Sequence, residues 1–112
     1  MPAPLLIKAS YPLKSKMQFT NAPANYTNNT CLQGYIRTTY DELVNIFGLP
    51  TEYKGDKVNV QWAILFSNGV VATIYDWKIS AAPLGVYDWH IGGKSKDAID
   101  CVKNALPLIA LM

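Results

Sequence analysis

Two short segments of the chain combine an aromatic ring with ionisable side chains. They are Asp76-Trp77-Lys78 and Asp88-Trp89-His90. An indole ring between charged neighbours suits stacking on a nucleobase. Lys78 or Arg37 is then placed to meet a phosphate, Arg37 through its two-pronged guanidinium group. Asp76 could accept a hydrogen bond from a base amino group or a ribose hydroxyl, so the residue types predict a nucleotide site.

A double glycine follows these residues, in Gly92-Gly93-Lys94-Ser95. The segment precedes a predicted helix, and backbone N–H groups at a helix N-terminus bind anions. We interpret it as a phosphate-binding turn, with an ordinary strand-to-helix turn as the alternative. The predicted ligand-binding residues are Arg37, Asp76, Trp77, Lys78, Trp89, His90, Gly92, Gly93 and Ser95.

His90 is the only histidine of the chain. It could act as a general base beside Asp76, but a His–Asp pair lacks a nucleophile and an oxyanion site. A metal site would need His90 with Asp76 or Asp88 and no further strong ligand. A structural role for His90, and a core role for the tryptophans, are the alternatives. The sequence therefore predicts binding, with no catalytic residue, metal or cofactor.

The composition sets the limits of this function. The chain has 112 residues, enough for one domain; 50% are hydrophobic, 16% are charged, and the net charge is +2. Neither a basic patch for duplex nucleic acid nor an acidic DNA mimic is expected. Cys31 and Cys101 stand too far apart for a disulfide framework or a metal motif. With no signal peptide and no membrane span recognised, we expect a cytoplasmic protein.

The elements that must position these residues follow from capping and alternation. We predict a strand over 32–37 and then a helix that starts at Thr39, because Thr39 and Glu42 form a capping box. The helix ends at Gly48. Residues 57–66 and 70–78 alternate as a hairpin, and Asn68-Gly69 predicts a two-residue turn. That turn pairs Ser67 with Val70 and Phe66 with Val71, which places Ala63 and Ala72 on one face and Trp62, Ile64, Thr73 and Tyr75 on the other.

A strand over 87–91 and a helix capped by Ser95 and ended by Pro107 complete the domain. The strand directs Trp89 and Ile91 to one face and His90 to the other. Residues 14–30 show no periodicity and are predicted as a loop or mobile arm. The expected fold is α+β, an antiparallel sheet of about four strands with two helices on one face and an N-terminal extension. We divide it into an arm over 1–31, with a short strand at 5–7, and a core over 32–112 whose apolar tail packs on the domain or on a second copy.

Four motifs resemble a family of small proteins encoded by tailed bacteriophages. They are Tyr40-x-x-Leu43-Val44-x-x-Phe47-Gly48-x-Pro50, Asp56-Lys57-Val58 with Trp62, the segment Phe66 to Lys78 with its Tyr-Asp-Trp-Lys ending, and Trp89-His90-Ile91-Gly92-Gly93-x-Ser95. The resemblance covers residues 33–106. The family has no settled activity, so the resemblance implies a phage origin and location in the bacterial host cytoplasm.

Short phage proteins often act against host defence, and by this analogy we expect a non-catalytic sponge for a small anionic nucleotide signal. Three other expectations stay open. The protein could inhibit or adapt a host protein, it could hydrolyse a nucleotide through His90 and Asp76, or it could have a structural role in the virion. Two apolar sheet faces in so small a chain also predict a homo-oligomer.

Overall fold

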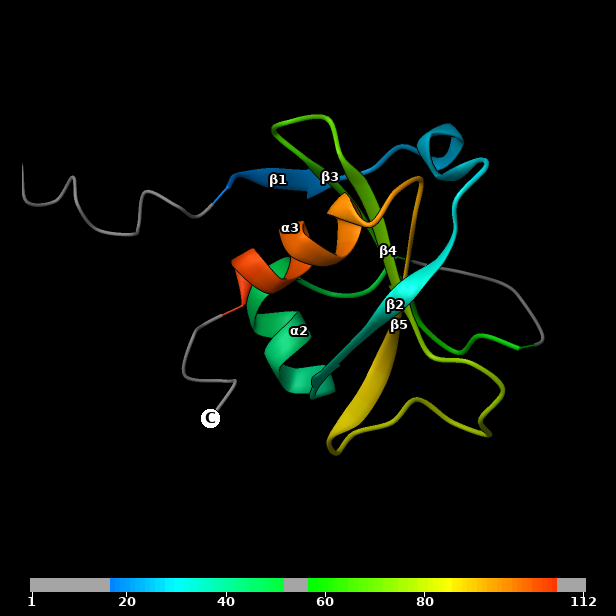
Figure 1. Ribbon diagram of the computed structural model, residues 1–112. Helices are drawn as coiled ribbons and strands as arrows, with labels where there is room; N and C mark the ends of the chain where they lie inside the picture. Colours follow the sequence, from blue (N-terminus) through cyan, green and yellow to red (C-terminus); the bar gives the residue numbers. More distant parts are fainter. Residues whose placement is uncertain (1–16, 52–56, 107–112) are drawn as a thin grey trace, which may run out of the picture.

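The computed structural model describes residues 17–51 and 57–106. Within them lie a five-stranded antiparallel sheet and two α-helices, an α+β arrangement (Figure 1). The strand predicted at 5–7 and the tail after Leu106 lie outside the described residues. No helix in the described part of the chain is long and apolar enough to cross a membrane.

The sheet has the strand order β1-β3-β4-β5-β2, and every neighbouring pair is antiparallel. The strands are β1 (Phe19–Asn21), β2 (Cys31–Thr38), β3 (Gln61–Phe66), β4 (Val71–Tyr75) and β5 (Tyr87–Gly93). Strands β1 and β2 therefore form the two edges, and the chain positions β3, β4 and β5 between them.

Strand β1 and the short 3₁₀-helix η2 (Ala24–Thr27) correct the prediction of a loop over 14–30. Phe19 anchors β1: it lies opposite Phe66, and its ring centre is 4.9 Å from that of Phe47 and 6.0 Å from that of Phe66. A strand of three residues is too short to show an alternating pattern. The contacts of one partly buried aromatic ring, rather than periodicity, place this segment on the sheet.

The first helix, α2 (Tyr40–Phe47), begins and ends as predicted. The Thr39 hydroxyl accepts a hydrogen bond from the Glu42 N–H at 3.1 Å. At the other end Gly48 has a φ of +85°, and its N–H donates to the Val44 carbonyl at 2.9 Å. A positive φ favours glycine, so this residue stops the helix.

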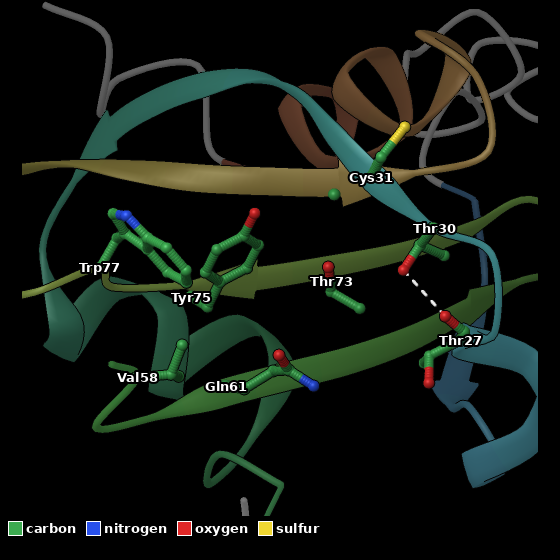
Figure 2. A pocket seen from close by; sticks show the side chains of 9 residues that line it. Thr27, Thr30, Cys31, Val58, Gln61, Thr73, Tyr75 and Trp77 are labelled. Atoms are coloured by element: carbon green, nitrogen blue, oxygen red, sulfur yellow. Dashed lines mark hydrogen bonds between the residues drawn. The ribbon is translucent and has the colours of Figure 1, made fainter. Parts of the chain in front are cut away.

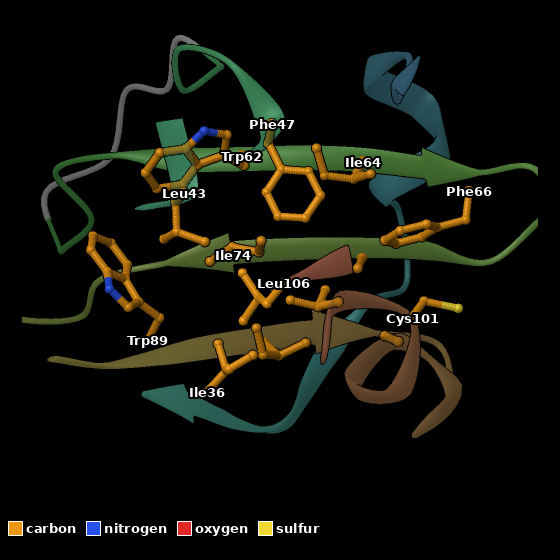
Figure 3. Packing of buried hydrophobic residues seen from close by; sticks show 14 residues of the cluster. Ile36, Leu43, Phe47, Trp62, Ile64, Phe66, Ile74, Trp89, Cys101 and Leu106 are labelled. Atoms are coloured by element: carbon orange, nitrogen blue, oxygen red, sulfur yellow. The ribbon is translucent and has the colours of Figure 1, made fainter. Parts of the chain in front are cut away.

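The second helix, α3 (Asp97–Ala105), packs beside α2 on the same face of the sheet, called here the inner face. Figure 3 shows the core between the helices and this face. Trp62 and Trp89 are its largest fully buried side chains. The core residues are Ile36, Leu43, Phe47, Trp62, Ile64, Phe66, Ala72, Ile74, Trp89, Ile91, Ala98, Cys101, Val102 and Leu106.

The β3–β4 hairpin has a register one residue away from the predicted one. The Phe66 N–H donates to the Val70 carbonyl at 2.9 Å, so the loop has three residues, and Ile64 lies opposite Ala72. In this loop only Gly69 has a positive φ, +91°, and the Asn68 side chain accepts from the Val70 N–H at 3.1 Å. A two-residue type I′ turn would need a positive φ at both central residues.

The changed register exchanges the residues of the two faces, because side chains alternate along a strand. Ala72 and Trp62 both face the helices, whereas Ala63 lies on the opposite, outer face with Val71. Thr73 and Tyr75 also leave the face of Trp62 and join Gln61 on the outer face. On β5 the predicted alternation holds, since Trp89 and Ile91 are buried in the core and His90 lies on the other side.

Candidate functional site

The outer face of the sheet carries a cavity of about 280 Å³ (Figure 2). Strands β3, β4 and β5 supply its floor, and the chain from η2 into β2 forms one end. Val58, which precedes β3, and Trp77, which follows β4, form the other end. The lining residues are Thr27, Thr30, Cys31, Val58, Gln61, Thr73, Tyr75, Trp77 and Gly92.

The floor of the cavity depends on the absence of a side chain at Gly92. A Cβ atom at this position would lie 2.4 Å from the Thr73 hydroxyl oxygen and 3.4 Å from the Tyr75 ring. Thr73 lies opposite Gly92 across the β4–β5 ladder, and Gln61 lies opposite Tyr75 across the β3–β4 ladder. Thus the pairing of three strands brings Gln61, Thr73 and Tyr75 together over a bare patch of backbone.

Trp77 stands at the end of the cavity with two ammonium groups beside it. The Nζ atoms of Lys57 and Lys78 each lie 5.9 Å from the centre of its ring. The backbone fixes this group: the Trp77 N–H donates to the Tyr87 hydroxyl at 3.2 Å, and the Lys78 N–H donates to the Lys57 carbonyl at 2.8 Å. Lys78 has a φ of +57°, an uncommon left-handed conformation for a lysine. Trp77 itself is 40% exposed, so its ring is accessible to a ligand.

His90 adjoins the cavity inside a group of aromatic rings. Its ring centre lies 4.9 Å from Tyr35, 5.3 Å from Tyr75 and 6.4 Å from Trp77. Its Nδ1 atom is buried and has no hydrogen-bond partner within the described part of the chain. Burial lowers the pKa of His90, and the nearby charge of Asp76 opposes this only in part. The environment of His90 therefore favours the neutral imidazole.

Two of the predicted site residues face the interior. Trp89 is fully buried, and its indole N–H donates to the Thr38 carbonyl at 3.1 Å. Asp76 is also fully buried. Its carboxylate accepts from the N–H of Asn59 at 2.8 Å, from the Asn59 side-chain amide at 2.7 Å and from the N–H of Val60 at 3.1 Å. Asp76 holds the chain that leads into β3, and these bonds occupy it.

Arg37 is exposed and makes an ion pair with Asp88 through two hydrogen bonds of 3.0 and 3.1 Å. This hydrogen bonding raises the pKa of Arg37 and lowers the pKa of Asp88. The pair lies on the β2–β5 ladder and contributes no residue to the lining of the cavity. Asp88 occupies Nε and one terminal nitrogen of Arg37, so a phosphate would compete with Asp88 for this guanidinium group.

Gly92 and Gly93 have different roles. Gly92 is in the cavity floor, but a Cβ at Gly93 would lie 2.5 Å from that of Ala98, so Gly93 allows α3 to approach the sheet. The Ser95 hydroxyl accepts from the Asp97 N–H at 3.2 Å, and the Ser95 carbonyl accepts from the Ala98 N–H. These bonds occupy two of the N–H groups at the start of α3, those of Asp97 and Ala98, as in an ordinary strand-to-helix turn.

The structure thus brings Trp77, Lys78, His90 and Gly92 to the outer face and directs Trp89, Asp76 and Gly93 elsewhere. Sequence reasoning did not propose Gln61, Thr73 or Tyr75 as site residues. The alternation in β3 and β4 carried a signal for them, but only the observed register places these three on one face.

The described residues contain no group of three or more side chains that could hold a metal ion. Comparison of the chain with protein-family models, with curated proteins and with solved structures finds no match. The geometry of the outer face therefore carries the functional interpretation.

Proposed function

We propose that this domain is a non-catalytic binding protein for a small planar anion of the nucleotide class, held on the outer face of the sheet. The observation that supports this most is the exposed Trp77 ring, with the ammonium groups of Lys57 and Lys78 near it, at the end of a cavity. A base stacked on an aromatic ring gains affinity whatever its hydrogen-bonding edge. Ammonium groups beside the ring attract the phosphate.

The absence of reactive pairs around the cavity favours binding over catalysis. Among the described lining residues, Cys31 and the threonines Thr27, Thr30 and Thr73 have no histidine or carboxylate beside them that would act as a base. His90 has rings for neighbours, and Asp76 is occupied by the chain before β3. A nucleotide bound here would be retained rather than converted.

The resemblance to tailed-phage proteins leads to a proposed biological role for this binding. A phage protein that holds a nucleotide without converting it would lower the concentration of a host defence signal, and we propose that role in the bacterial cytoplasm. Because a sponge acts by stoichiometry, its effect requires about as many sites as signal molecules. Assembly into a homo-oligomer would concentrate such sites.

Native mass spectrometry of protein purified gently from a bacterial host tests the proposal. We expect a mass above an integer multiple of the chain mass, and the excess should be lost in the Trp77→Ala variant. A ligand-free mass, together with no thermal stabilisation by any nucleotide of a broad panel, would reject nucleotide binding.

A second candidate is inhibition of a host protein through the loop between β4 and β5. This loop exposes large apolar side chains: Trp77 is 40% exposed, Ile79 37%, Leu84 73% and Val86 66%. Such exposure is typical of an interaction site. If this candidate is right, a pull-down from host lysate recovers one partner at equal stoichiometry. Leu84→Asp then abolishes recovery, and Gln61→Ala does not.

A further inference from the structure

We propose that Gln61 is the residue that reads the base of the bound nucleotide, and that the base is adenine. This inference rests on the proposed function and adds a base-specific contact to it. Gln61 lies on β3 with its side chain directed into the cavity (Figure 2). It lies opposite Tyr75 across the β3–β4 ladder, and the ring centre of Tyr75 is 6.3 Å from that of Trp77, beside which the two ammonium groups lie.

Two polar side chains of the floor make no hydrogen bond to another residue that the structure describes. The Thr73 side chain is nearly buried, since the residue is 4% exposed, yet its hydroxyl makes no hydrogen bond to another described residue. The Gln61 carboxamide makes none either within the described ranges. Among the described residues the buried side-chain atom without a partner is His90 Nδ1, so solvent in the cavity still reaches Thr73 and Gln61. A ligand that fills the cavity displaces this solvent and keeps both groups satisfied only if it supplies matching donors and acceptors.

The distribution of charge around the cavity indicates where the base and the phosphate of the ligand would lie. The described lining residues of the cavity include no lysine, arginine, histidine, aspartate or glutamate. A phosphate would lose its hydration in this floor without gaining a counter-charge. The neutral base therefore belongs on the floor, and the phosphate belongs beside Lys57 and Lys78.

The size of the cavity agrees with one base and its sugar. Ligand pockets usually measure about 300–1,000 Å³, and this one, at about 280 Å³, lies just below that range. One chain would therefore accommodate a single nucleoside unit, stacked against Trp77 with its edge toward Gln61.

A carboxamide offers one donor and one acceptor side by side, and this pair matches the amino group and ring nitrogen of adenine. A carboxylate only accepts, so Gln61→Glu would favour the two adjacent N–H donors of guanine. Thr73 adds a hydroxyl that can donate or accept, and it does not discriminate between bases. Discrimination is therefore assigned to Gln61.

Isothermal titration with three ligands tests the assignment: AMP, GMP, and purine riboside 5′-monophosphate, which lacks the 6-amino group. The intact protein should bind AMP about 5- to 150-fold more tightly than the purine riboside compound, the range expected for one bidentate contact. Gln61→Ala should remove that preference, and Gln61→Glu should shift the AMP-to-GMP ratio toward GMP. Gln18→Ala, which changes an exposed glutamine outside this cavity, should leave all three affinities unchanged.

The outcomes separate this inference from the proposed function. If the protein binds neither these three nucleotides nor any other, both the proposed function and the role of Gln61 are overturned. Nucleotide binding with an unchanged preference in Gln61→Ala, or tighter binding of GMP than AMP by the intact protein, would overturn the role of Gln61 alone. Equal thermal unfolding midpoints for the four proteins would exclude misfolding as the cause of a lost preference.

Discussion

The two faces of the sheet use the same residue types in opposite ways. On the inner face Trp62 and Trp89 are fully buried, and each indole N–H donates to a backbone carbonyl, that of Gly48 and that of Thr38. On the outer face Trp77 is 40% exposed, and two lysine ammonium groups and the rings of Tyr75 and His90 lie near its ring. A buried indole with a satisfied N–H stabilises the fold, whereas an exposed indole beside cations is available to a ligand. Burial and partners, and not residue type, therefore distinguish structure from function.

Removal of an inner-face indole should give the largest effect on stability. Trp62→Ala should lower the free energy of unfolding by about 3–5 kcal/mol, because it leaves a cavity in the core. Trp77→Ala, the same change on the outer face, should cost below about 1 kcal/mol. Urea unfolding followed by far-UV circular dichroism measures both values, and similar costs for the two variants would break the comparison.

Asp76 tests whether an acidic residue in a predicted ligand site is structural. Asp76→Asn replaces one acceptor oxygen with a donor that faces the N–H groups of Asn59 and Val60. We expect a loss of about 2–3 kcal/mol in the free energy of unfolding, since a buried donor then lacks an acceptor. The same urea titration is the measurement. Unchanged stability with lost nucleotide binding would instead return Asp76 to the ligand site.

The β3–β4 hairpin and Asp76 show what the sequence could and could not predict. Capping at Thr39, the stop at Gly48 and the alternation of β5 are local properties, and they were predicted correctly from a few neighbouring residues. The hairpin register depends on whether the loop has two or three residues, and Asn68-Gly69 is compatible with both. One residue of shift decides which side chains line the cavity, so Gln61, Thr73 and Tyr75 could not be found. Likewise, the type and position of Asp76 do not reveal that Asn59 and Val60 occupy its carboxylate.

On the outer face, Trp77→Ala should weaken nucleotide affinity without unfolding the protein. Loss of one stacked base costs about 1–3 kcal/mol, roughly 5- to 150-fold in Kd. Fluorescence anisotropy with a labelled mononucleotide measures this loss, and Leu32→Ala, at an exposed position of β2, is the matched control. A variant that retains full affinity would remove Trp77 from the site.

A smaller effect is expected from His90 on acidification. Its pKa is lowered in the folded protein below the ordinary value of 6.5, so the unfolded chain binds the proton more readily. The contribution of His90 to the free energy of unfolding should be fully present above about pH 6.5, and it should be lost as the pH falls below that value. Urea midpoints between pH 5 and pH 8 should show this decrease in the intact protein and a flatter profile in His90→Gln. A steeper profile in the variant would contradict the assigned sign.

The smallest effect should come from the ion pair of Arg37 and Asp88. Both side chains are largely exposed, at 71% and 54%, so solvent and salt screen their attraction. Arg37→Ala should leave both the thermal midpoint and nucleotide affinity close to those of the intact protein. Titration of the intact protein and of Arg37→Ala with the same nucleotide measures this. A clear loss of affinity in the variant would show that the ligand competes with Asp88 and binds Arg37.

Chemical-shift mapping tests most directly whether the outer face is the binding surface. A ¹⁵N-labelled sample titrated with a mixture of the four ribonucleoside monophosphates should show its largest shifts at Gln61, Thr73, Trp77 and Gly92. Resonances of the inner face, such as those of Leu43 and Val102, should move little. Shifts confined to the helices or to the β2 edge, or no shifts at all, would contradict a nucleotide site on the outer face.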